Sequence, residues 1–326
     1  MQNRSLELIK TIEDFSQRNL LLLLIISAIG LALYIPAPKA LMDKLNINVI
    51  LVAAIFISQG ISMDLSRAHK ATSYLKMITG AALIAVVAYP FLAWVMTLLF
   101  GLSSDLKVGF LLMASFPSSL EAAMAMSASA GGDPLTAIIL MASLNIIGLV
   151  SIPLNLSVWL GAESHISEWQ ILYELITYLF VPIVLGQVLR RFFPSLPGKM
   201  RRANHYLPML CIAALVYISC SQEVDLFREL KLHDFLHIMA PCLVLHLSMF
   251  GIAFLAAKMW LRLGKTSGRS FMLITSIKPM SLSVALWAVT YAEHHPLAIF
   301  PIIVFYVSQM VVDSFIVSKM VATNDS

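Results

Sequence analysis

Long apolar runs, separated by short polar connections, extend over nearly the whole of this chain. A bilayer core requires about 20 apolar residues of helix. Runs of that length recur here, without the strict alternation that is typical of membrane strands. The pattern predicts ten transmembrane helices, at 19–36, 47–65, 72–100, 107–131, 134–160, 168–191, 206–225, 235–262, 269–292 and 296–320. We therefore expect an all-α polytopic membrane protein.

The basic residues predict how these helices are oriented. Of the 22 Lys and Arg residues, 16 fall on the side of the membrane that holds the two ends of the chain and the loops 2–3, 4–5, 6–7 and 8–9. Five fall on the other side, and Lys278 lies inside span 9. Because basic residues favour the cytoplasmic side, both termini are predicted to be cytoplasmic.

The stretch from Phe116 to Pro134, FPSSLEAAMAMSASAGGDP, departs from this pattern inside span 4. Pro117 has no N–H group to donate and disfavours a helical conformation of the residue before it. Glu121 is costly at the membrane centre unless it faces protein or water. The stretch predicts a broken helix that lines a polar cavity.

A second stretch, from Lys278 to Pro296, resembles the first at an offset of 162 residues. Pro117-Ser118-Ser119-Leu120 corresponds to Pro279-Met280-Ser281-Leu282, and each is followed by a second Pro-Leu pair. Proline-interrupted segments at corresponding positions of two halves indicate a transporter's binding site. We expect a cytoplasmic lead at 1–18 and two inverted five-helix repeats, at 19–160 and 161–326, in which helices 4 and 9 are broken and cross.

Composition agrees with a membrane protein, since 59% of residues are hydrophobic and 12% are charged. A soluble chain has about twice this share of charged residues. The basic residues lie between apolar runs, so no nucleic-acid surface is indicated. Cys211, Cys220 and Cys242 lie in apolar stretches, where packing is the expected role. The expected partners are a small-molecule substrate and membrane lipids, and the oligomeric state stays open.

Several polar residues within the spans are candidates for substrate or ion binding. Glu121 and Lys278 are the leading ones, because intramembrane ionisable residues are functional by default. The serines at the breaks either bind substrate or bond carbonyls freed by proline; they are Ser118, Ser119, Ser127, Ser129, Ser281 and Ser283. Asn145 and Gln309 either line the cavity or tie helices together.

Other polar residues are predicted to be structural. Asp313 and His246 are interpreted as polar residues satisfied between helices. His294 and His295, beside Glu293, lack the spacing of a metal site. No metal site is therefore predicted. Met124, Met126 and Met141 are interpreted as adaptable packing.

Alternative classes of protein fit less well. No pair of aspartates or Ser-His dyad typical of an intramembrane protease is present, so an enzyme is not expected. No repeated filter of a channel is present either. A non-transporting regulatory or scaffold protein on a transporter fold is the remaining alternative.

With its order of motifs, the chain resembles the bile acid:sodium symporter family. The residues that carry the resemblance are SSLEAAMAMSASAGGDPLTAIILMASLNIIGLVSIPL (118–154), FISQGISMDL (56–65), VPIVLGQVLRR (181–191) and TSIKPMSLSVAL (275–286). The resemblance implies a panel of spans 1, 2, 6 and 7 and a core of the other six. It also implies transport of organic anions, often driven by sodium, and a cell-membrane location such as the bacterial inner membrane.

The chain departs from the sodium-coupled members of that family at their ligand positions. Where those members carry a glutamate and a glutamine in span 9 and a glutamine in span 3, this chain has Ile274, Lys278 and Ala85. The Ser-Asn pair of span 4 falls near Ala123 and Met124. Since sodium requires oxygen ligands, we expect no sodium cofactor. We predict instead an ion pair between Glu121 and Lys278, in which the ammonium acts as a tethered cation. Transport is then expected to be coupled to protons or to no ion.

Overall fold

A computed structural model describes residues 20–38, 46–62, 74–119, 121–160, 173, 175–222, 224–225 and 232–322. All regular structure in this part of the chain is helical. The predicted N-terminal lead, 1–18, lies outside it, as does most of the connection 161–174 between the two predicted repeats.

Helices lie within each of the ten predicted ranges. In chain order they are α2 (Leu20–Tyr34), α4 (Ile47–Ser62), α5 (Leu75–Ala82), η2 (Leu83–Ala88), α6 (Tyr89–Leu99), α7 (Ser104–Ser115), α8 (Glu121–Ser129), α9 (Pro134–Leu160), η3 (Leu175–Phe180), α11 (Val181–Phe192), α12 (Leu196–Lys199), α13 (Arg201–Gln222), α15 (Leu232–Leu255), η4 (Ala256–Trp260), α16 (Lys265–Ser276), α17 (Met280–Leu286), η5 (Trp287–Tyr291), η6 (Pro296–Ala298) and α18 (Ile299–Ala322). The segments η2 to η5 are π-helical turns continuous with an adjoining α-helix, and η6 is a 3₁₀ turn.

Six of the described helical segments are long and apolar enough to cross a membrane. They are Leu75–Leu99, Pro134–Leu160, Arg202–Gln222, Phe235–Trp260, Lys265–Tyr291 and Pro296–Val321. Two shorter apolar helices, Leu23–Tyr34 and Ile47–Ser62, accompany them. The chain is therefore a multi-pass membrane protein.

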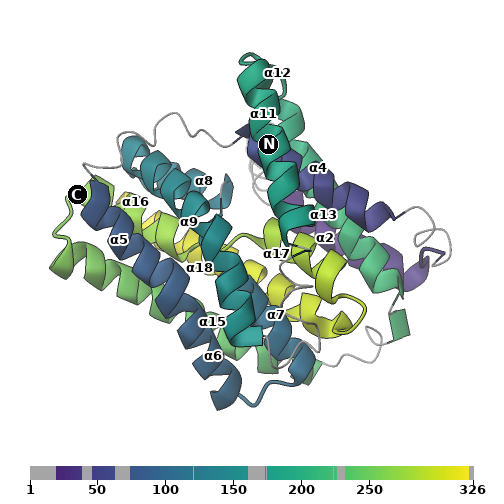
Figure 1. Cartoon of the computed structure of the whole chain (residues 1–326). Helices are drawn as coiled ribbons and strands as arrows, with labels where there is room; N and C mark the ends of the chain where they lie inside the picture. The colour runs from purple at the N-terminus through teal and green to yellow at the C-terminus, as the bar shows by residue number, and fades with distance from the viewer. Residues whose placement is uncertain are drawn as a thin grey trace, which may run out of the picture.

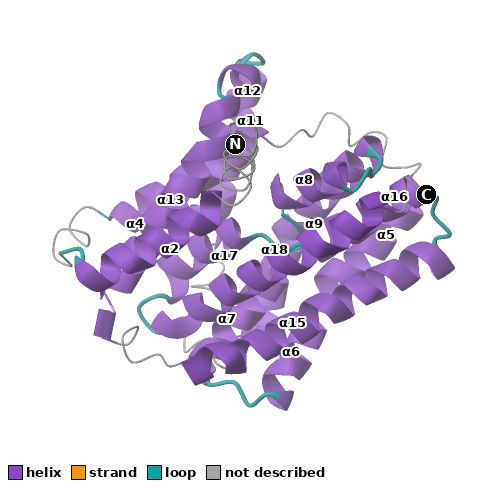
Figure 2. Ribbon diagram, turned by 180° about the vertical axis from the view of Figure 1, so that it is seen from behind, coloured by secondary structure: helices purple, strands orange, loops and turns teal. Residues whose placement is uncertain are grey.

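The helices form two groups, which Figures 1 and 2 show from opposite sides. We call α2, α4, α11 and α13 the panel, and the helices from α5 to α9 and from α15 to α18 the core. Within the panel, α4 contacts α11 and α13, and α13 also contacts α2. This grouping agrees with the panel and core that the family resemblance implies.

A close approach of two backbones holds the panel together. A Cβ atom on Gly60 of α4 would lie 2.3 Å from the Ile183 carbonyl oxygen, and one on Gly186 of α11 would lie 2.4 Å from the Ile57 carbonyl oxygen. Only glycine fits at either position. The side chain of Gln187 adds a hydrogen bond to the Gly60 carbonyl, so α4 and α11 form one rigid unit.

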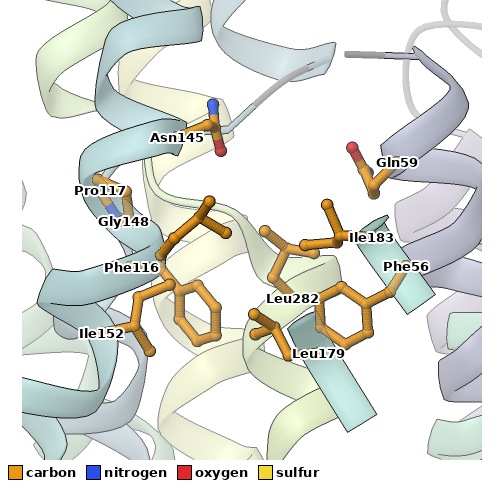
Figure 3. A pocket seen from close by; sticks show the side chains of 11 residues that line it. Phe56, Gln59, Phe116, Pro117, Asn145, Gly148, Ile152, Leu179, Ile183 and Leu282 are labelled. Carbon is orange, nitrogen blue, oxygen red and sulfur yellow. The ribbon is translucent and has the colours of Figure 1, made fainter. Parts of the chain in front are cut away.

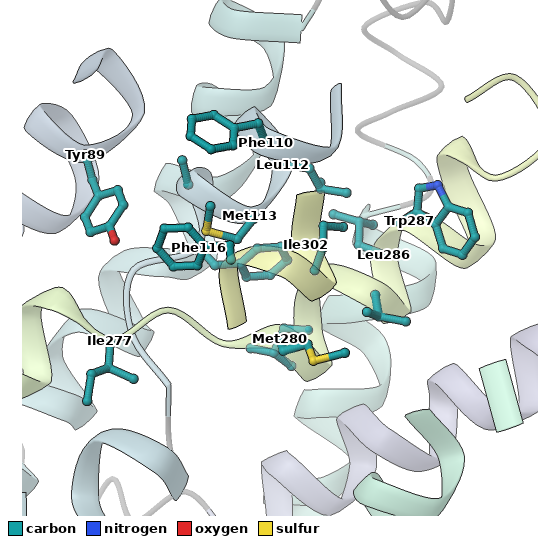
Figure 4. Packing of buried hydrophobic residues seen from close by; sticks show 14 of the residues in the cluster. Tyr89, Phe110, Leu112, Met113, Phe116, Ile277, Met280, Leu286, Trp287 and Ile302 are labelled. Atoms are coloured by element: carbon teal, nitrogen blue, oxygen red, sulfur yellow. The ribbon is translucent and has the colours of Figure 1, made fainter. Parts of the chain in front are cut away.

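Large apolar side chains fill the space between the core helices (Figure 4). Tyr89, Phe110, Phe116, Trp287 and other apolar residues are fully buried there. The three cysteines are free and buried, as predicted. Lys278, with 1% of its surface exposed, is among the largest buried side chains of the described residues.

Candidate functional site: two helix breaks beside a cavity

Two core helices are interrupted where the sequence predicts it. The first break comprises residues 116–119, between α7 and α8, and the second break comprises residues 277–279, between α16 and α17. Phe116 (φ −76°, ψ 136°) and Ile277 (φ −84°, ψ 118°) both leave the helical region as their helices end. Pro117 favours the extended conformation of Phe116, because proline disfavours helical geometry at the residue before it.

The two breaks contact each other directly. The backbone N–H of Ser119 donates to the carbonyl of Ile277 at 3.0 Å. The Ser118 hydroxyl donates to the carbonyl of Ile274 at 2.6 Å. That carbonyl needs a partner because the N–H four residues ahead, on Lys278, is used elsewhere. The first break thus supplies hydrogen-bond donors to the second.

Lys278, from the second break, supplies donors to the first. Its Nζ donates to the carbonyl oxygens of Ala85 at 3.0 Å, Ala114 at 3.0 Å and Phe116 at 2.6 Å. We call these three oxygens the carbonyl cluster. Nζ also lies 3.9 Å from the centroid of the Tyr89 ring, over its face, where a cation is attracted by the ring's quadrupole. Three carbonyls match the three hydrogens of an ammonium group.

A proline and a helix end explain why two of these carbonyls need a partner. In η2 the N–H of Tyr89 bonds the carbonyl of Ile84, five residues back. By the same spacing the Ala85 carbonyl would bond the N–H of residue 90, which is Pro90 and has none. Ala114 lies one residue from the end of α7, so no further helical turn follows its carbonyl. The ammonium of Lys278 donates to both carbonyls.

Gln309 of α18 holds the backbone of the second break. Its Oε1 accepts from the N–H of Lys278 at 2.8 Å, and its Nε2 donates to the carbonyl of Lys278 at 3.3 Å. Gln309 is fully buried. Of the two roles that the sequence leaves open for this amide, the structure shows the tie between helices.

Asn145 shows the other role. Its side chain lies at a cavity and donates to the Met141 carbonyl, one turn earlier in α9. The serines predicted at the breaks differ among themselves. Ser283 is buried and donates to the Pro279 carbonyl, Ser127 donates to the Ser270 hydroxyl, Ser281 is half-buried and Ser129 is exposed.

Glu121 is the first residue of α8, but its side chain lies outside the described residues. The ion pair with Lys278 that the sequence predicts therefore stays a prediction. That prediction assumes that the Lys278 ammonium needs a compensating partner in the membrane interior. In the structure, the carbonyl cluster and the Tyr89 ring are such partners.

A cavity lies between the panel and the first break (Figure 3). The space at this cavity measures about 450 Å³ when the open solvent at its mouth is counted. Its lining residues are Phe56, Gln59, Phe116, Pro117, Asn145, Gly148, Leu149, Ile152, Leu179, Ile183 and Leu282. The walls are apolar apart from the amides of Gln59, from the panel, and Asn145, from the core. Phe116 faces two ways, since its ring lines the cavity and its carbonyl accepts from Lys278.

Two further pairs of polar residues lie in the core. His246 of α15 and Asp313 of α18 are fully buried, and Nε2 lies 2.8 Å from Oδ1. The sequence predicts that they are satisfied between helices. They pair with each other, but among the described residues one further polar atom of each has no partner. His295 lies 2.9 Å from Asp105. Within the described residues no group of three His, Cys, Asp or Glu side chains is placed to hold a metal ion.

The protein has apolar spanning helices, and two helices are interrupted and touch at their breaks beside a cavity. This arrangement is typical of secondary transporters with discontinuous helices. A family model narrows the class, because the model of the SBF-like CPA transporter family matches residues 19–322. The chain belongs to this family, and it is a transporter-family protein, not an enzyme.

Individual relatives agree with that assignment. The chain is 22% identical to a probable sodium/metabolite cotransporter BASS4, chloroplastic, of Arabidopsis thaliana over 95% of this chain and 74% of the relative. It is also 22% identical to sodium/bile acid cotransporter 7 of Danio rerio, over 85% of this chain and 84% of the relative, and to that of Rattus norvegicus, over 90% and 89%.

A sodium ion does not fit the residues present at the predicted ligand positions. Ile274 and Ala85 have no side-chain oxygen to offer, although a hard cation requires oxygen ligands. The carbonyl of Ala85, which could serve instead, accepts from Lys278. The position is therefore filled by the Lys278 side chain, whose Nζ donates to three carbonyl oxygens.

Proposed function

We propose that this protein is a secondary transporter of an organic anion, or a similar small solute, that works by alternating access without sodium. The observation that carries the proposal is the position of Lys278. Its ammonium binds the carbonyl cluster and so holds the two breaks together, as a coupling cation would. The family membership supports the transport class, and the name of the sodium/bile acid cotransporters among the relatives supports an anionic solute.

The architecture proposed for this activity is ten spans in two inverted repeats, with both termini in the cytoplasm. A pair of contacts at the repeat offset supports it. In the first half, the N–H of Asp133 bonds the carbonyl of Thr266 at 3.2 Å, which ties the segment after α8 to the start of α16. His295, 162 residues after Asp133, bonds Asp105 and so ties the segment after η5 to the start of α7.

The cavity is the proposed solute site. Its apolar walls suit the body of an amphipathic molecule, and the Gln59 and Asn145 amides can donate to an oxygen of the solute. The cavity lies where panel and core meet, so a movement of one against the other changes which side of the membrane it opens to.

Uptake into proteoliposomes tests the proposal. The probe is a labelled pool of small carboxylates together with labelled taurocholate, offered once in sodium chloride and once in N-methylglucamine chloride. We expect saturable uptake that is equal in the two salts. Asn145→Leu should weaken it by changing the cavity, while Ser129→Ala, at an exposed position, serves as the matched control. No saturable uptake in either salt would favour a non-transporting protein, and uptake that requires sodium would overturn the role given to Lys278.

A further inference from the structure

The pair of His246 and Asp313 uses only half of its hydrogen-bonding capacity. Both side chains have no exposed surface, and Nε2 of the imidazole lies 2.8 Å from Oδ1 of the carboxyl group. Among the described residues, Nδ1 of His246 and Oδ2 of Asp313 have no hydrogen-bond partner. A simple tie between helices needs only one neutral hydrogen bond, whereas an ionisable pair with two unused atoms in an apolar interior is costly.

An aromatic ring contacts the pair, and the helices packed around it carry further titratable groups. The ring of Phe305 stands edge-on to the imidazole, with centroids 5.8 Å apart. Many titratable or charged groups lie on the elements packed around the pair. They are Cys242 and His237 on α15, Tyr89 on α6, Lys278 at the second break, Lys258 on η4, Lys265 and Arg269 on α16, Asp105 and Lys107 on α7, His295 beside η6, and Tyr306 and Lys319 on α18. His233 and Asp234 on α15 and Glu121 on α8 have side chains outside the described residues. Of these, Arg269 is engaged with the carbonyls of Ala130 and Met320.

Packed side chains connect the pair to Lys278. The Tyr89 ring, which carries the ammonium on its face, contacts Phe305 with centroids 6.4 Å apart, and Phe305 contacts His246. On the other side, Gln309 holds the backbone of Lys278 and lies one helical turn before Asp313. The pair and the ammonium are thus parts of one rigid region.

The charges of this region suggest what the pair does. With a neutral imidazole, the Asp313 carboxylate carries one negative charge and offsets the ammonium of Lys278. One further proton, bound at Oδ2 of Asp313, neutralises the pair and leaves the region with the positive charge of Lys278. An anionic solute at the neighbouring cavity would then be bound more favourably, and by linkage the solute would favour the proton.

We infer that His246 and Asp313 form a proton-binding site through which this transporter takes up a proton together with its anionic solute. The inference rests on the proposed function, because a solute is needed for coupling. Proton binding itself needs no solute, so the proton-binding site and the transport function can be tested separately.

Infrared difference spectroscopy of the purified protein in nanodiscs, recorded between neutral and acidic pH, measures proton binding directly. We expect a C=O band of a protonated carboxyl group that is absent in Asp313→Asn and displaced along the pH axis in His246→Gln. The matched controls are Asp105→Asn and His295→Gln, because that pair joins the same residue types at 2.9 Å at another place in the core. If Asp313→Asn does not assemble, His246→Gln, which keeps the carboxyl group, decides the question.

Transport provides the second measurement. An inward proton gradient should stimulate uptake of labelled taurocholate, or of whichever labelled carboxylate is taken up. Coupling between two ligands is typically worth about 5- to 150-fold, so we expect Asp313→Asn to lose about tenfold in gradient-driven uptake while solute exchange at equal pH persists. A carboxyl band that survives in Asp313→Asn and does not move in His246→Gln would overturn the inference. So would wild-type uptake that ignores the gradient. Absence of all wild-type uptake, with the band behaving as expected, would contradict the proposed function and leave a proton site.

Discussion

The two breaks have corresponding positions but different chemistry. The first break reads Phe116-Pro117-Ser118-Ser119, and the residues 162 positions later read Lys278-Pro279-Met280-Ser281. The first break gives a hydroxyl and an N–H to carbonyls of the second helix. The second break gives an ammonium to carbonyls around the first.

This difference explains how two interrupted helices can cross inside a membrane. Each break leaves carbonyls without helical partners, and an unpaired polar group in an apolar interior is costly. Each break here carries the donors that the other one lacks. The two breaks are complementary where they touch, and the basic side chain lies in only one of them.

The largest effect is expected when the charged half of this arrangement is removed. Lys278→Ala leaves three buried carbonyls unpaired, at about 1–3 kcal/mol each when water does not replace the ammonium. We expect a thermal unfolding temperature well below that of the wild type, and no uptake. Adding ethylammonium or sodium should restore part of both, because the cluster of oxygens suits a small cation. Stability unchanged in Lys278→Ala would contradict the role of the ammonium.

Substituting the prolines tests whether transport depends equally on the proline of each break. Pro117→Ala provides an N–H that can bond the carbonyl of Met113 and extend α7 into the first break. We expect a folded protein without uptake. Pro279→Ala should cost less, because Gln309 still occupies the N–H and carbonyl of Lys278. Uptake and thermal unfolding of the two variants, compared side by side, check this order, and equal losses of uptake would contradict it.

The two amides provide the next comparison. Gln309→Leu removes two hydrogen bonds from the second break, and we expect a loss of about 1–3 kcal/mol for each backbone group left unpaired. Asn145→Leu, at the cavity, should leave the unfolding temperature close to that of the wild type and change solute uptake instead. Finding the stability loss in Asn145→Leu rather than in Gln309→Leu would reverse the assignment of their roles.

The smallest effect is expected at Asp133, which follows the first broken helix as His295 follows the second. Asp133 accepts from the hydroxyl and N–H of Thr136 at the start of α9. The Thr136 hydroxyl is the main reason why the pKa of Asp133 lies below the usual 3.8. Since the pKa is lower in the folded protein, this stabilisation is complete above the usual pKa and is lost as the pH falls through the lowered value.

Asp133→Ala should therefore cost about 1 kcal/mol, as loss of a helix cap does, with the difference from wild type shrinking in acid. Thermal unfolding between neutral pH and pH about 3 measures it, with Ser129→Ala as a control that leaves the cap intact. A difference that grows in acid would contradict the assigned pKa.

The sequence predicts the positions of the breaks well and their partners poorly. Pro117, Pro279 and the depth of Lys278 in span 9 follow from residue identity and spacing. The acceptors of Lys278 do not, because Ala85, Ala114 and Phe116 act through backbone oxygens, which every residue has. Pro90 was the available signal, since a proline removes a donor from the turn before it. The cation–π contact with Tyr89 depends on the packing of separate spans, which periodicity does not specify.

The same limit applies to the other polar residues. Asn145 and Gln309 look alike in the sequence, as amides in the middle of long apolar spans. Only packing distinguishes the one that faces the cavity from the one that ties the second break. His246 and Asp313 were interpreted as interhelical residues, but 67 positions separate them, and their pairing depends on how α15 and α18 pack.

The covalent attachment of Lys278 has a thermodynamic consequence. A dissociable cation occupies its site according to its concentration in the medium. When it moves down its gradient across the membrane, it can drive transport of a solute. An ammonium on a side chain occupies its site at any ionic composition, and it crosses no membrane as cargo. Under the proposed function, such a built-in cation would keep the two broken helices in contact in sodium-free surroundings, and the driving force would come from the solute itself or from another ion.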